Sequence, residues 1–151
     1  QALGELDIEL VEEFQKVKIN SKLEEDLKRK RRYLLLSKLW VLGAYELIRF
    51  LNDINKRRNF LENESKTKLK ELLTTFSKVR VPLAKFQKVG KDKTLYDGVA
   101  DSFFDSEKGV GWKVYSHCKN KLEKEIFYRN DLGDLLLDLL KEMKTDIEKS
   151  A

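Results

Sequence analysis

The stretch from 33 to 51, YLLLSKLWVLGAYELIRFL, constrains the fold most, because as a helix it is apolar on almost every side. A helix that is apolar all round is typical of a protein core. Lys38, Glu46 and Arg49 interrupt it, and its longest uncharged run is far below the roughly 20 residues that cross a bilayer. We therefore predict a mainly α-helical bundle around one long buried helix at about 21–56, and no membrane association.

Apolar periodicity predicts three further helices. Near the N-terminus, four apolar residues share one helical face: Leu6, Leu10, Phe14 and Val17. The alternation of apolar and polar residues over 6–10 also fits a short strand. A helix beginning at Ser65 is expected to end at Pro82, since the residue before a proline avoids helical backbone. A wide apolar stripe predicts a C-terminal helix over 131–149, with Asn130 as its N-cap.

The region between 95 and 130 has a different character. Val110, Trp112 and Val114 alternate with less apolar neighbours, which is the pattern of a strand with one buried face. Residues 102–104 and 125–129 are its candidate partners, the first across a turn at 105–109. We expect a small antiparallel β element within 95–130. No repeat or long linker divides the chain, so we expect one domain over 1–151.

Composition and charge bound the class of protein. Of 151 residues, 41% are hydrophobic and 38% charged, which suits a soluble globular protein. The lone Cys118 excludes an intrachain disulfide, and the acidic start of the chain lacks the apolar segment of a signal peptide. We therefore expect a cytoplasmic protein. The chain starts with Gln1 rather than Met, so the question of whether a short segment precedes it stays open.

The net charge of +5 conceals a strong asymmetry along the chain. Residues 26–93 hold 19 basic and 7 acidic side chains, and both flanking segments are acidic overall. A basic surface of this kind can bind nucleic acid or another polyanion. The candidate residues lie within 28–58: Lys28, Arg31, Arg32, Lys56 and Arg57. The simpler interpretation is a solvated helix surface, with the acidic ends packed beside the basic middle in the fold or across an oligomer.

No catalytic, cofactor or metal site is predicted. His117 and Cys118 are adjacent, and neighbours on a strand point to opposite faces. Three aspartates at four-residue spacing, Asp97, Asp101 and Asp105, would share one face of a helix and could hold Mg²⁺ or Ca²⁺. Nearby glycines favour a loop, in which that alignment is lost. The phosphate-binding and nucleophile motifs GxxxxGK[ST], GxGxxG and GxSxG are absent.

Charged residues inside the apolar helix form the remaining candidate site. Glu46 and Arg49 share a helix face and can pair. If they are buried, they must pair, because an isolated internal charge is costly. They form either a structural ion pair or, with Tyr45, a polar pocket in which Arg49 binds an anion. Asp53, one turn beyond Arg49, would compete with Glu46 for the guanidinium.

The sequence YRND at 128–131 resembles the RN opening of the RxxxxH motif of HEPN ribonuclease domains, which have a similar size and helical character. The resemblance implies metal-independent RNA cleavage. Residues 134–136 are Asp, Leu and Leu, so the required histidine is missing. The cleavage chemistry is therefore not carried over to this chain, and no family is assigned.

These observations predict a non-enzymatic cytoplasmic interaction module that self-associates, as a dimer, through the leucine-rich segment 132–140 of the last helix. The alternative is a nucleic-acid-binding protein that uses the basic region 28–58. A third reading is an enzyme of unrecognised type with a polar site at Tyr45, Glu46 and Arg49.

Overall fold

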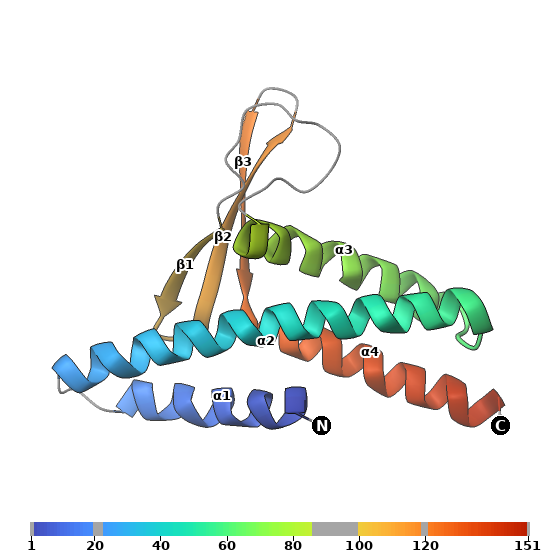
Figure 1. Ribbon diagram of the computed structural model, residues 1–151, viewed down its shortest axis with the longest axis horizontal. Coiled ribbons are helices and arrows are strands. Elements are labelled where there is room, and N and C mark those ends of the chain that lie inside the picture. The colour runs from blue at the N-terminus through green and yellow to red at the C-terminus, as the bar shows by residue number, and fades with distance from the viewer. Residues whose placement is uncertain (1, 20–22, 86–99, 119–120, 151) are drawn as a thin grey trace.

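The computed structural model describes residues 2–19, 23–85, 100–118 and 121–150. These residues form a mainly α-helical fold with a small antiparallel sheet, as predicted (Figure 1). The elements, in chain order, are α1 (Ala2–Ile19), α2 (Leu23–Arg58), α3 (Asn63–Lys85), β1 (Ala100–Asp105), β2 (Gly109–Cys118), β3 (Lys121–Tyr128) and α4 (Arg129–Ser150). None of the described helices combines the length and hydropathy that crossing a bilayer requires.

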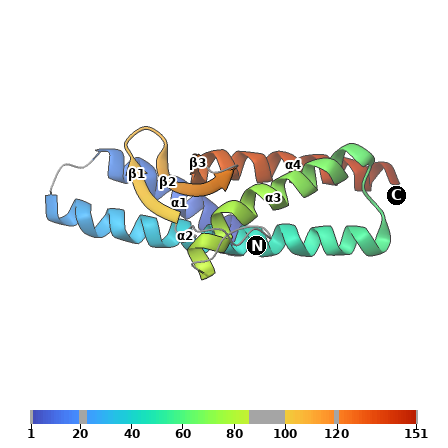
Figure 2. The same cartoon turned by 90° about the horizontal axis from the view of Figure 1, so that it is seen from above.

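Helix α2 organises the fold but is buried on one side only. Its core-facing side chains recur at helical spacing: Tyr33, Trp40, Val41, Ala44 and Ile48. Trp40 packs against Phe76 of α3, with ring centroids 6.0 Å apart. The prediction that this helix is buried all round is wrong. Figure 2 shows α2 along one long edge of the molecule, with α4 and most of α3 on one side of it and the end of α3 nearest the sheet crossing over it.

Helix α3 passes through Pro82 and ends at Lys85, so the predicted end at Pro82 is also wrong. Proline removes one N–H and therefore one helical hydrogen bond, here to the carbonyl of Lys78. Val79 and Leu83 on either side are buried in the core. We infer that this packing holds the last turn helical despite the missing bond.

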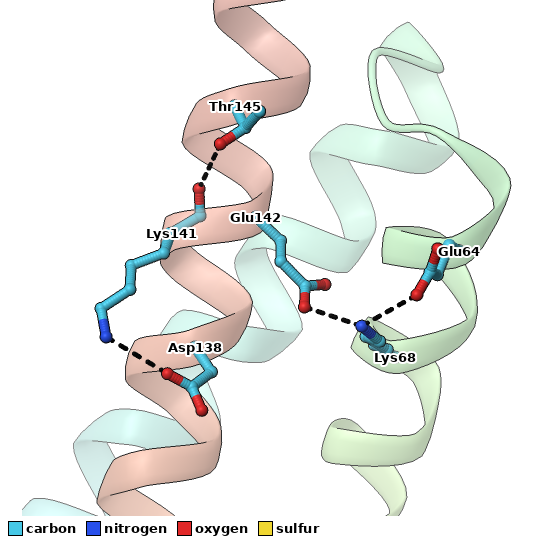
Figure 3. Close-up of polar contacts among 6 residues, drawn as sticks. All are labelled: Glu64, Lys68, Asp138, Lys141, Glu142 and Thr145. Atoms are coloured by element: carbon cyan, nitrogen blue, oxygen red, sulfur yellow. Dashed lines mark hydrogen bonds and ion pairs between the residues drawn. The ribbon is translucent and has the colours of Figure 1, made fainter.

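Helices α3 and α4 are also joined by charge (Figure 3). The Lys68 ammonium on α3 donates to Glu142 of α4 at 2.7 Å and pairs with Glu64 at 3.0 Å. The hydrogen bond that Lys68 donates to Glu142, and then the one that it donates to Glu64, raise the pKa of Lys68 above its ordinary value. Both helices therefore stay close on their solvent side as well as in the core.

The sheet has the order β1-β2-β3, with antiparallel pairing throughout. Val110, Trp112 and Val114 of β2 are buried on its inner face, as their alternation predicted. The β1–β2 turn is closed by Asp105, whose Oδ1 accepts from the backbone N–H groups of Glu107 at 2.8 Å and Lys108 at 2.9 Å. These two bonds lower the pKa of the Asp105 carboxyl.

Helix α4 follows β3 directly and uses most of its apolar stripe inside the fold. Four stripe residues are buried: Leu132, Leu136, Leu139 and Met143. Leu135 and Leu137 remain half exposed, but they lie 200° apart around the helix and do not form one surface. Three leucines of the segment 132–140, on which the predicted dimer surface was based, are therefore buried within the fold.

Candidate functional site

A row of apolar side chains on α2 faces solvent. Leu35, Leu39 and Phe50 are 58%, 50% and 60% exposed, and Leu42 between them is partly exposed. Steps of three, four and eight residues keep these side chains on one side of a helix. We call these four residues the outward face of α2.

The basic residues predicted to bind polyanions lie at the two ends of this face. Lys28, Arg31 and Arg32 precede it, and Lys56 and Arg57 follow it. At 1.5 Å per residue, Lys28 and Lys56 are about 42 Å apart along the helix. The structure therefore does not gather the predicted set into one patch.

Part of this charge is also paired. The Arg32 guanidinium bonds Glu9 of α1 at 2.8 Å, and the Lys56 ammonium bonds Asp53 at 3.3 Å. Asp53 therefore pairs with Lys56, and the expected competition with Glu46 for Arg49 is not seen in the described contacts.

Glu46 and Arg49 form the predicted ion pair, with 2.7 Å between Oε2 and Nη2. The prediction that this pair is buried is wrong, because the two side chains are 43% and 57% exposed. Both residues lie on the open side of α2, where water solvates them.

Glu46 also links α2 to α3. Its Oε1 accepts a hydrogen bond from Arg80 at 3.2 Å, and the Arg80 guanidinium lies 4.9 Å from the centre of the Tyr45 ring. Tyr45, Glu46 and Arg49 are thus a surface cluster closed by a cation from α3. An exposed cluster of this kind contributes little to stability.

A buried charged group that was not predicted lies at the start of α4. Arg129 is 2% exposed, and its guanidinium lies 4.9 Å from the Trp40 ring. It bonds the Asp7 carboxylate of α1 and donates to Asn130 Oδ1 at 2.9 Å. Burial lowers the pKa of Arg129 to about 10, against the opposing effect of Asp134. The sequence offered no signal for this pair, because its partners are 122 residues apart.

A pocket of about 190 Å³ lies between α1 and the start of α4. It is lined by Asp7, Val11, Phe14, Gln15, Arg129, Asn130, Gly133, Asp134 and Leu137. Of the lining residues, Arg129 is the one cation, and its terminal nitrogens already bond Asp7 and Asn130. The enclosed Arg129 is an internal ion-pair partner rather than an open phosphate-binding group.

The other residues considered for chemistry do not converge. Asp101 and Asp105 stand at the two ends of a strand, so the helical alignment of three aspartates does not occur, and Asp97 lies outside the described residues. His117 and Cys118 belong to β2, but their side chains also lie outside the described part. Within the described ranges, no three His, Cys, Asp or Glu side chains gather around a possible metal position.

Comparisons with known proteins gave no relative: no family model matches the chain, and no match was found among curated proteins or solved structures.

Proposed function

We propose that this protein is a self-associating interaction module, and that two copies pair through the outward face of α2. The observation that supports the proposal is the row of three large apolar side chains, each at least half exposed, on one side of a helix. Single apolar residues are normal on a surface, but these lie on one side of α2, interrupted between Leu42 and Phe50 by the exposed ion pair of Glu46 and Arg49, and such a grouping favours an interaction site. The exposed leucines of α4, which point apart, are a weaker candidate.

The spacing along α2 suits antiparallel pairing about Leu42 and Gly43. In that register Leu35 of one copy lies opposite Phe50 of the second copy, and Leu39 lies opposite Glu46, which keeps its ion pair with Arg49. Arg32 likewise lies opposite Asp53 of the second copy, so unlike charges meet beside the apolar contact. The same register brings Lys28 opposite Arg57 at the solvated ends, where repulsion between like charges is screened by salt.

The test compares two equally exposed leucines. Leu39 and Leu135 are 50% and 52% exposed, on α2 and α4 respectively. In sedimentation equilibrium, the parent and Leu135→Glu should form dimers, and Leu39→Glu should be monomeric because a carboxylate would be desolvated at the contact.

Two results would refute this proposal. A monomeric parent at high micromolar concentration would remove self-association altogether. A dimer that survives Leu39→Glu but is lost in Leu135→Glu would move the contact to α4. Circular dichroism of both variants shows whether each keeps its helical content.

A further inference from the structure

The outer face of the sheet carries a second, separate arrangement. The inner face of β2 is covered by the helices, whereas Phe103, Gly111 and Tyr128 form one cross-strand row on the other face. Next to this row, Ile126 of β3 is 44% exposed. This face is therefore open to solvent along β3.

Two aromatic rings cover the middle of the row. A Cβ on Gly111 would lie 2.6 Å from Cζ of Phe103 and 3.1 Å from Cδ1 of Tyr128, so only glycine allows both rings to lie against the β2 backbone. The ring centroids are 5.8 Å apart and the planes meet at 76°. Each ring therefore presents its outer side in a different direction.

Lysines surround these rings. The Lys113 ammonium lies 4.9 Å from the Phe103 centroid, and the Lys108 ammonium lies 4.7 Å from the Tyr128 centroid. Lys124 is exposed on β3, four residues before Tyr128 and on the same face of the strand. Among the described strand residues that the register places on this face there are two carboxylates, Asp101 and Asp105, and the Asp105 carboxylate already accepts two N–H groups of the β1–β2 turn.

We propose that this face binds single-stranded nucleic acid. Unpaired bases would stack on Phe103 and Tyr128, because aromatic rings stack on bases whatever their sequence. The ammonium groups of Lys108 and Lys113, which lie over the rings, would move outward and neutralise phosphates. A duplex hides its base faces, so it lacks this stacking contribution. The proposal does not depend on the α2 dimer, because it uses different residues on a different face.

Fluorescence anisotropy with a labelled oligouridylate of roughly ten nucleotides tests the proposal, since known sites span about 4–16 nucleotides. With three phosphate contacts, the affinity should fall roughly 18-fold between 50 and 200 mM salt. Phe103→Leu keeps an apolar side chain but removes the ring, and should weaken binding about 5- to 150-fold. Phe50→Leu removes an exposed ring on α2 and should bind like the parent.

A matched pair of lysine variants distinguishes a specific binding site from general electrostatic attraction between the protein and the oligonucleotide. Lys113→Gln should weaken binding and reduce the salt slope by about 0.7. Lys70→Gln, which removes an exposed lysine from α3, should do neither. The proposal is overturned by no binding at 50 mM salt, by equal affinity for a duplex of the same length, by parental affinity in Phe103→Leu, or by equal losses in the two lysine variants. If Phe103→Leu alters the circular dichroism spectrum, its lost binding is not evidence for stacking, and the comparison of Lys113→Gln with Lys70→Gln decides whether the proposal holds.

Discussion

The two partners of the ion pair between Asp7 and Arg129 are buried to different extents. Removing one partner should therefore cost more stability than removing the other. The Arg129 side chain is 3% exposed and the Asp7 side chain is 41% exposed. Asp7→Ala leaves a buried cation without its carboxylate, and breaking a buried pair in this way costs 3–5 kcal/mol. We expect about 3 kcal/mol, the lower end, because Asn130 still accepts a bond and Asp134 is close.

Removing the cation instead of the carboxylate should lower the free energy of unfolding by less. Arg129→Met fills the space over Trp40 with an apolar side chain, and the Asp7 carboxylate that remains can bind water. The loss is then mainly the cation–ring contact, worth about 2 kcal/mol at a desolvated site, and it is offset in part because no cation has to be buried. Urea unfolding at neutral pH measures both free energies, and the melting temperature of Asp7→Ala should fall by about 6–12 °C.

A matched control lies two residues further along α1. Glu9→Ala removes the exposed partner of Arg32, whose side chain is 64% exposed, and should cost less than about 1 kcal/mol. An Arg129→Met variant that loses as much stability as Asp7→Ala, or more, would refute the reasoning. It would mean that the guanidinium stabilises the fold by more than the cost of its burial.

Three further changes test other contacts. The Tyr33 hydroxyl is buried without a hydrogen-bond partner among the described residues, and burial raises its pKa to about 12; Tyr33→Phe should therefore stabilise the protein by about 1 kcal/mol in urea unfolding, and destabilisation would contradict this. Arg49→Met should cost less than about 1 kcal/mol, since its pair with Glu46 is exposed, and a loss of several kcal/mol would show that the pair is buried in solution. Hydrogen bonds from Ser65 and from the backbone of Glu62 lower the pKa of Asp146, so its contribution is present above the unfolded value of 3.8 and lost as the pH falls through the folded value. Asp146→Asn should accordingly melt below the parent at neutral pH and converge with it below about pH 4, and a constant difference across this range would oppose the assignment.

Local pattern was sufficient to place the elements. The spacing of Leu6, Leu10 and Phe14 predicts α1, and the alternation of Val110, Trp112 and Val114 predicts the central strand, because both periods follow from backbone geometry alone. Pro82 shows the limit of the same rule. A local preference against helix before proline is outweighed where the residues on both sides are buried in the core.

The sites depend on contacts that no local pattern encodes. Whether Leu35 and Leu39 are covered depends on which side of α2 the other elements occupy, and an all-apolar helix is compatible with either side. The contact of Arg129 with Asp7 joins the first helix to the last. The arrangement of Phe103 and Tyr128 over Gly111 requires the register of three strands, and a shift by one residue would turn the rings inward.

The two proposed surfaces are compatible in one assembly. Phe104 of the sheet packs against Tyr33, with ring centroids 6.1 Å apart, and Tyr33 precedes the proposed dimer centre on α2 by about ten residues. Antiparallel pairing therefore places the sheets of the two copies toward opposite ends of the dimer, and the two sheets are displaced from each other by roughly 28 Å along the helix axis. A strand long enough to reach both sheets would gain avidity from the dimer, whereas a short oligonucleotide would not. Leu39→Glu should then weaken binding of a long strand alone, because it separates the copies without touching either open sheet face.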